Sequence, residues 1–118
     1  MPRSPAPLSR GDRIGVTSPS AGPAAARADE LTAMLCDPSI RCVVPPWGGE
    51  TAIDLVDLVD WDALAAADPT SLVGYSDLST ILVPITTRLG WATLHGDNLA
   101  DTPYRPPEGL VVVRGGPA

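Results

Sequence analysis

The segment Gly74-Tyr75-Ser76-Asp77 carries the residues best suited to chemistry in this chain of 118 residues. An apolar run precedes it and a helical pattern follows, which predicts a sharp strand-to-helix turn at Ser76. A serine on such a turn is exposed for nucleophilic attack at the positive end of the helix dipole. Gly74 permits the tight backbone, and the backbone amide of Asp77 would stabilise an oxyanion at the same point. The plainer interpretation is that Ser76 caps the following helix.

A second segment, Trp47-Gly48-Gly49-Glu50, follows another predicted strand. Paired glycines let backbone N–H groups approach a ligand closely, although the same pair also occurs in ordinary turns. His95, the single histidine, is a candidate base for Ser76, with Glu50 as the acid that orients it. The alternative for His95 is a hydrogen-bonded structural residue at the end of a strand.

Three aspartates spaced three apart suggest either a metal cluster or the solvated face of a helix, and the second interpretation is favoured: Asp54, Asp57 and Asp60. One histidine and two cysteines are too few for an ordinary zinc site. We therefore predict neither a metal nor a cofactor. The two cysteines, Cys36 and Cys42, do not form a disulfide framework and are expected to be free thiols.

Apolar periodicity predicts the elements that must position these residues. Strands are expected at 13–17, 40–44, 71–75, 91–95 and 110–113, and helices at 24–36, 51–59 and 78–89. This alternation predicts an α/β fold with a small, mostly parallel sheet and flanking helices. Ligands of such sheets bind at the carboxyl ends of the strands, where the loops 18–23, 45–50 and 75–77 would meet.

The charge and length of the chain exclude several classes of function. Fourteen acidic and eight basic residues give a net charge of −6, which disfavours binding to nucleic acid or to an anionic membrane. The sequence contains no apolar run of about 20 residues and no secretion signal, so we expect a cytoplasmic protein. The boundaries that we predict are a flexible leader at 1–12, an α/β domain at 13–98 and a linker at 99–118.

In their order along the chain, several segments resemble the LD-carboxypeptidase family of serine peptidases. Each segment alone is weak, but their collinear agreement over most of residues 10–98 is specific. The segments are Gly11 to Ser20, Arg27 to Leu31, Asp37 to Arg41, Gly48 to Thr51, Pro69 to Leu72, Gly74 to Thr80 and Thr93 to Gly96.

The resemblance implies that Ser76 is the nucleophile and that the amides of Asp77 and Gly49 form an oxyanion hole. It also implies that Gly48 and Tyr75 contact the substrate. Members of this family remove a terminal D-amino acid from a cell-wall peptide or cleave a peptidyl-nucleotide antibiotic. A peptide or peptidyl-nucleotide is therefore the expected partner.

The chain departs from the family pattern in two ways. The family's catalytic Glu and His lie in a second domain, whose start residues 99–118 resemble, so they have no counterpart here. We therefore expect an inactive fragment that needs a complementary C-terminal segment. A strand and helix of the family are also missing near Gly22, which would expose the first strand as a sheet edge and favour a homodimer or marginal stability. The alternative function is a non-catalytic α/β remnant or binding module; a dinucleotide-binding domain is disfavoured because G-x-G-x-x-G is absent.

Overall fold

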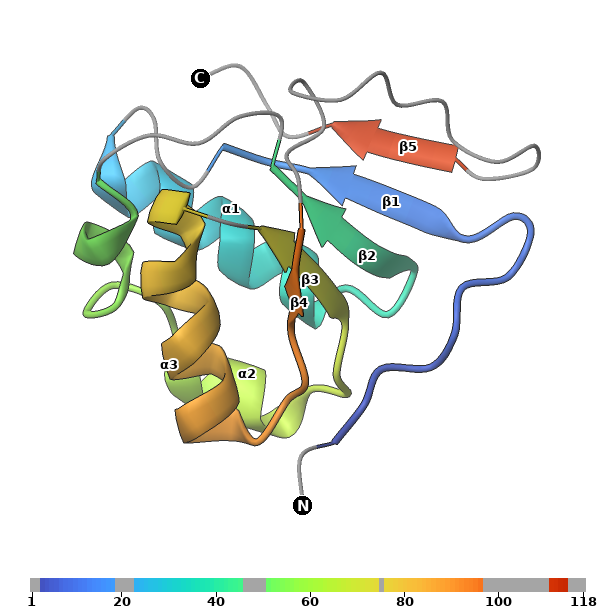
Figure 1. Ribbon diagram of the computed structural model, residues 1–118. Helices are drawn as coiled ribbons and strands as arrows, with labels where there is room; N and C mark the ends of the chain where they lie inside the picture. The colour runs from blue at the N-terminus through green and yellow to red at the C-terminus, as the bar shows by residue number, and fades with distance from the viewer. Residues whose placement is uncertain (1–2, 19–22, 46–50, 75, 97–110, 115–118) are drawn as a thin grey trace.

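The computed structural model describes residues 3–18, 23–45, 51–74, 76–96 and 111–114 (Figure 1). Within these ranges, strands and helices alternate along the chain as the sequence predicts. The elements are β1 (Arg13–Val16), α1 (Ala24–Cys36), β2 (Ile40–Val44), the 3₁₀ turn η1 (Ala52–Leu55), α2 (Trp61–Ala66), β3 (Ser71–Gly74), the 3₁₀ turn η2 (Ser76–Leu78), α3 (Ser79–Leu89), β4 (Leu94–His95) and β5 (Val111–Arg114).

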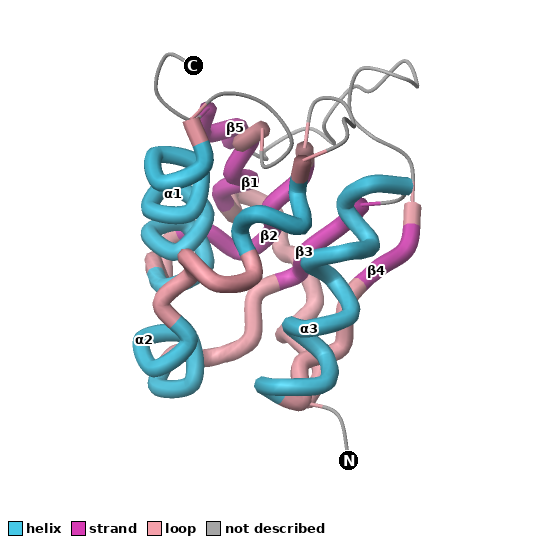
Figure 2. The backbone as a smooth tube through the Cα atoms, turned by 90° about the vertical axis from the view of Figure 1, so that its left-hand side faces the viewer, coloured by secondary structure: helices cyan, strands magenta, loops and turns pink. Residues whose placement is uncertain are grey.

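The strands form one sheet in the order β4-β3-β2-β1-β5, and each pair of neighbours is parallel. The predicted α/β class with a small parallel sheet is confirmed. In Figure 1 the helices α1, α2 and α3 lie to the left of the strands, and Figure 2 looks at the sheet from that helical side. The carboxyl ends of β1, β2 and β3 therefore lie at a common edge, as parallel pairing requires.

A single apolar cluster fills the space between the sheet and the helices. Helix α1 contributes Ala28, Leu31 and Leu35, whose spacing of three and four residues puts them on one face. Strands β2 and β3 contribute Val43 and Leu72, which pair in register. Each fully buried leucine adds about 1.5–3 kcal/mol relative to an exposed one, so this cluster is the main source of stability.

The segment between β2 and β3 differs from its prediction. A single helix over 51–59 is wrong, because a four-residue 3₁₀ turn, η1, stands there and is followed by the separate helix α2. Asp60 explains the division, since its carboxylate accepts a hydrogen bond from the amide of Ala63 at 3.0 Å and so caps α2. Asp60 was expected on the solvated face of the predicted helix, and its role as a cap was not predicted.

The expectation that the first strand is an exposed sheet edge is also wrong. Strand β5 pairs with β1 along its full length, from Arg13 opposite Val111 to Val16 opposite Arg114. Residues 111–114 correspond to the strand predicted at 110–113, within the range assigned to a linker, and they extend the same sheet. A run of β-branched residues favours this pairing, because such residues suit a strand and β1 offers unpaired backbone groups.

The expected strand 91–95 is shorter in the structure, where β4 holds two residues and pairs with Val73 and Gly74. Trp91 instead forms an isolated parallel bridge with Arg3 in the predicted leader. The amide of Ala92 donates to the carbonyl of Arg3 at 2.8 Å. The flexibility of residues 1–12 stays a prediction, but this contact ties residue 3 to the end of α3.

Candidate active site

Ser76 lies where the sequence analysis expects it, at the turn between β3 and α3. Strand β3 ends at Gly74, and Ser76 begins the 3₁₀ turn η2 that leads into α3. Its side chain is exposed, and its φ of 55° makes it the described non-glycine residue with a left-handed backbone. This conformation costs about 1–2 kcal/mol for a residue with a Cβ, so the surrounding structure has to stabilise it.

Gly74 allows the turn to pack closely against the core. A Cβ at this position would lie 2.7 Å from Cβ of Leu78, which is fully buried. Such a distance is too short for two carbon atoms, so any side chain at position 74 would displace the turn. The glycine two residues before Ser76 is therefore required by packing and not by its own φ.

The interpretation of Ser76 as a simple helix cap does not fit α3. The N-cap of this helix is Leu78, and no side chain caps it. Ser76 instead lies two residues earlier, at the first position of η2. Its exposed hydroxyl is therefore available to another partner, which the nucleophile interpretation requires.

The side chain of Asp77 connects the turn to a distant part of the chain. Its Oδ2 accepts a hydrogen bond from the amide of Ala52 at 2.9 Å. The hydroxyl of Thr80 donates to the carbonyl oxygen of Asp77 at 2.7 Å. The residue after Ser76 is thus held on both sides, by η1 through its carboxylate and by α3 through its carbonyl.

Four polar residues that were not predicted as site residues lie near the same sheet edge. Arg27 is buried in α1 and donates from Nη1 to Oγ1 of Thr51 at 3.2 Å. The hydroxyl of buried Thr17, which follows β1, donates to the carboxylate of Glu30. A signal for Arg27 was present in the sequence, because it precedes Leu31 by four residues and so falls on the buried stripe of α1.

The other predicted site residues are only partly covered by the described structure. His95 pairs with Gly74 in register, so it lies at the edge of the sheet that carries Ser76, and its side chain is exposed. Its role as a base stays a prediction. Gly48, Gly49, Glu50 and Tyr75 lie outside the described residues.

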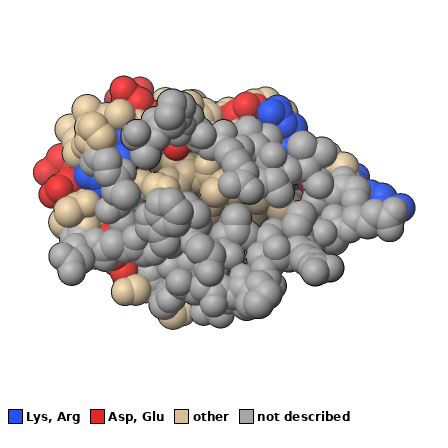
Figure 3. Space-filling model, turned by 90° about the horizontal axis from the view of Figure 1, so that it is seen from above, with Lys and Arg blue, Asp and Glu red and all other residues tan. Residues whose placement is uncertain are grey.

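In Figure 3, which looks down on the molecule, described acidic and basic side chains lie along the upper margin and at the left and right sides, with described uncharged residues between them. Among the described residues, no group of three or more His, Cys, Asp and Glu side chains is placed to hold a metal ion. In the same part of the chain, no helix is long and apolar enough to cross a membrane.

Comparison with known proteins decides the family. The profile of the LD-carboxypeptidase N-terminal domain matches residues 9–96, which are most of the chain and include the whole turn at Ser76. The chain belongs to the LD-carboxypeptidase family. The resemblance noted from the sequence segments is thereby confirmed.

Three relatives of this LD-carboxypeptidase domain are longer proteins, and the match covers only part of each. A Streptomyces coelicolor protein named as a carboxypeptidase is 43% identical over 76 residues, which are 64% of this chain and 24% of the relative. A Vibrio cholerae protein named in the same way is 37% identical, over 62% of this chain and 22% of the relative. The microcin C7 self-immunity protein MccF of Escherichia coli is 33% identical, over 62% of this chain and 21% of its own length. The matched region thus spans between a fifth and a quarter of each relative.

Solved structures agree with this fold. MccF in complex with glutamyl sulfamoyl guanosine has a TM-score of 0.78 and 25% identity, covering 87% of this chain and 42% of that one. An MccF-like protein from Bacillus anthracis has a TM-score of 0.75 and 20% identity, covering 83% of this chain and 41% of that one. Both likenesses therefore extend over most of the LD-carboxypeptidase domain described here.

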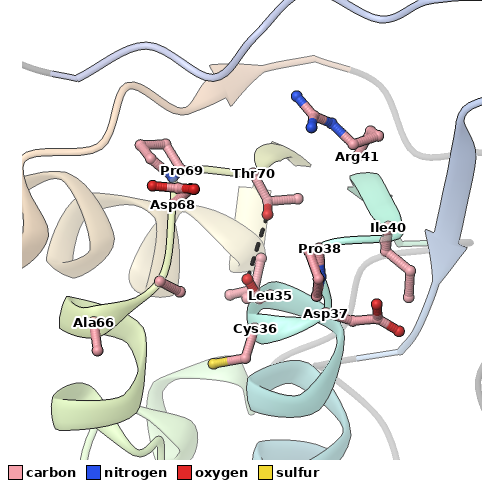
Figure 4. Close-up of a pocket in the computed structure, with 11 residues that line it drawn as sticks. Leu35, Cys36, Asp37, Pro38, Ile40, Arg41, Ala66, Asp68, Pro69 and Thr70 are labelled. Atoms are coloured by element: carbon pink, nitrogen blue, oxygen red, sulfur yellow. Dashed lines mark hydrogen bonds between the residues drawn. The ribbon is translucent and has the colours of Figure 1, made fainter.

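A cavity of about 250 Å³ lies at the other end of the sheet (Figure 4). Its walls are the end of α1 and the residues that precede β2 and β3, so it faces the amino ends of the strands. Thr70 is buried there and donates to the carbonyl of Leu35 at 3.3 Å. Hydrogen bonds from Ser39 lower the pKa of Asp37, and burial raises the pKa of Cys36. In this LD-carboxypeptidase domain the cavity and Ser76 therefore lie at opposite edges.

Proposed function

We propose that this chain supplies the nucleophile-bearing half of an LD-carboxypeptidase site, with Ser76 as the nucleophile. The observation that carries the proposal is the left-handed, exposed Ser76 at the carboxyl end of β3, in a chain that belongs to this family. Strained backbone at a strand-to-helix turn is the arrangement that presents a nucleophile above a sheet. The amides of Asp77 and Gly49 would form the oxyanion hole, and Gly48 and Tyr75 would contact the substrate.

The reaction is the hydrolysis of an amide next to a carboxylate-bearing end. Oγ of Ser76 forms a bond to the amide carbonyl carbon while its proton passes to a base. The C–N bond then breaks, the nitrogen takes that proton, and the terminal D-amino acid leaves. Water hydrolyses the remaining serine ester and regenerates the hydroxyl.

The general base for Ser76 is the group that this sequence lacks, because the family's catalytic His and Glu have no counterpart in it. We propose that a complementary segment carrying His and Glu supplies it, either on a second polypeptide or from a longer form of the protein. A serine without an adjacent base is a poor nucleophile at neutral pH. Loss of triad members costs roughly 10⁴–10⁶-fold in rate in other serine peptidases, so the chain alone should hydrolyse peptides very slowly.

Two substrate classes fit the proposal. One is a cell-wall peptide that ends in a D-amino acid. The other is a peptidyl-nucleotide, and it is supported by the MccF structures with glutamyl sulfamoyl guanosine and with aspartyl sulfamoyl adenosine. Calorimetric titration of the chain with a murein tetrapeptide and with an aminoacyl sulfamoyl nucleoside would separate the two classes. Binding without any reaction of Ser76, even with a homologous C-terminal domain present, would favour the non-catalytic binding module.

A fluorophosphonate probe tests the nucleophile directly, because it phosphonylates an activated serine. With a homologous C-terminal domain present to supply the base, we expect labelling at Ser76 that is abolished in Ser76→Ala. Ser79→Ala is the matched control, since Ser79 lies three residues further on at the start of α3 and should not affect labelling. Addition of a homologous C-terminal domain should raise both labelling and tetrapeptide hydrolysis. Labelling that persists in Ser76→Ala would refute the assignment, and rapid hydrolysis by the chain alone would refute the need for a second segment.

A further inference from the structure

The conformation of Ser76 requires a cause that the turn itself does not supply. Ser76 has a Cβ, and its φ of 55° lies in the left-handed region that favours glycine. Asn and Asp adopt this region more readily than serine does, because their side chains hydrogen-bond locally. Contacts from neighbouring residues must therefore hold Ser76 in place.

One such contact is made by the carboxylate of Asp77, the residue that follows Ser76. Its Oδ2 lies 2.9 Å from the amide nitrogen of Ala52, which is 25 positions away in the chain. Ala52 is fully buried at the start of η1, so water could not replace the carboxylate as a partner of its amide if this hydrogen bond were lost. A hydrogen bond between a carboxylate and a buried amide is among the stronger kinds in proteins.

The partner of Asp77 is itself fixed in position. Nη1 of Arg27 donates to Oγ1 of Thr51 at 3.2 Å and contacts the carbonyl oxygen of Thr51 at 3.4 Å. Arg27 is buried in α1, and Thr51 immediately precedes Ala52. The junction of Thr51 and Ala52 is thus held from two elements, α1 and the turn after β3.

The backbone carbonyl of Asp77 is held as well. Thr80 donates to the carbonyl of Asp77 at 2.7 Å, and Leu78, the next residue, is fully buried in the core. Rotation of Ser76 into a right-handed conformation would change the direction in which the chain enters Asp77. Since α3 and the core hold the following residues, that rotation would remove the carboxylate from Ala52.

We propose that Asp77 is a positioning residue whose carboxylate, bonded to the amide of Ala52, holds Ser76 in the left-handed conformation that presents its hydroxyl. The inference rests on the proposed function of Ser76 as the nucleophile. It adds a role for the side chain of Asp77 to the proposed role of its backbone amide.

Backbone chemical shifts and amide hydrogen exchange test the inference in the chain as it is. Asp77→Ala removes the acceptor, whereas Asp77→Asn keeps an oxygen that can accept from Ala52. Asp57→Ala is the matched control, because Asp57 is an exposed carboxylate on the segment that follows η1. If Asp77→Ala does not fold, Asp77→Ser replaces it, since a hydroxyl on Cβ is one bond too short to reach Ala52.

We expect Asp77→Ala to lose the left-handed shifts of Ser76 and to speed exchange of the Ala52 amide by about tenfold or more. Asp77→Asn and Asp57→Ala should keep both properties of the unaltered chain. The inference is overturned if Ser76 stays left-handed and Ala52 stays protected in the variant without the acceptor. It is also overturned if Asp77→Asn behaves like Asp77→Ala, because the acceptor oxygen would then not be the cause.

Labelling with the fluorophosphonate separates this inference from the proposed function. If Ser76 is the nucleophile, Asp77→Ala should slow its labelling about tenfold, and Asp77→Asn should restore the rate to within about threefold. If the unaltered chain shows no labelling above Ser76→Ala even with a homologous C-terminal domain present, the proposed function fails. The chemical shifts and exchange rates still decide in that case whether Asp77 controls the conformation of Ser76.

Discussion

Substitution of Gly74 by alanine tests the packing that creates the turn at Ser76. The new Cβ would lie 2.7 Å from Cβ of Leu78 and 3.1 Å from its Cγ. Leu78 is fully buried, so it has no free space into which it can move. The Cβ of Leu78 is attached to the backbone of η2, and relief of the clash therefore requires movement of the segment that contains Ser76.

The expected magnitude follows from two opposing effects. Overpacking of a well-packed core costs about 1–3 kcal/mol. Gly74 is not one of the described glycines with positive φ, which are Gly11 and Gly90. Alanine can therefore adopt its backbone, and the reduced entropy of the unfolded chain returns about 0.4–1 kcal/mol. We expect a net loss of about 1–2 kcal/mol in the free energy of unfolding, or a decrease of roughly 4–10 °C in Tm.

Chemical denaturation and thermal unfolding, followed by circular dichroism, measure this loss. Gly96→Ala is the matched control, because among the described residues a Cβ there meets only Cγ1 of Val73 at 3.5 Å, an ordinary contact. We expect Gly96→Ala to change stability by less than about 0.5 kcal/mol. If Gly74→Ala is as stable as the unaltered chain and leaves the chemical shifts of Ser76 unchanged, the packing argument for the turn is refuted.

The remaining predictions concern a buried cation and the two thiols. Arg27→Ala should lower the free energy of unfolding by about 1.5–3 kcal/mol, because Thr51 loses a charged donor; equal denaturation midpoints for the variant and the unaltered chain would contradict this. Burial raises the pKa of Cys42 to about 11 from 9.0. The thiol therefore ionises at a lower pH in the unfolded chain than in the folded chain. The contribution of the neutral, buried thiol to stability is complete below pH 9 and is lost as pH rises toward 11. The unaltered chain should therefore lose roughly 1–2 kcal/mol more than Cys42→Ala between pH 8 and 10.5. A thiol reagent at pH 8 should modify Cys36, which is only half-buried, well before Cys42.

Local pattern was sufficient for much of the fold. The spacing of Ala28, Leu31 and Leu35 determines which face of α1 is buried, and Asp37 with Pro38 ends that helix at the predicted residue. The β-branched runs determine β1 and β2, and their alternation with helices implies parallel pairing. The same reasoning failed between β2 and β3, because one hydrogen bond, from the amide of Ala63 to the carboxylate of Asp60, decided where α2 begins.

The sequence by itself determined the identity of Ser76 as the residue on the bend, because glycine before it and a helical pattern after it are local signals. Only the tertiary structure decided what fixes that bend. Ala52 lies 25 residues before Asp77, so that contact has no local pattern. Gly74 and Leu78 are four residues apart, but the core that holds Leu78 against Gly74 is assembled from distant elements. The position of β5 beside β1 was decided in the same way, since pairing between strands far apart in the chain depends on which sheet edge is left unpaired.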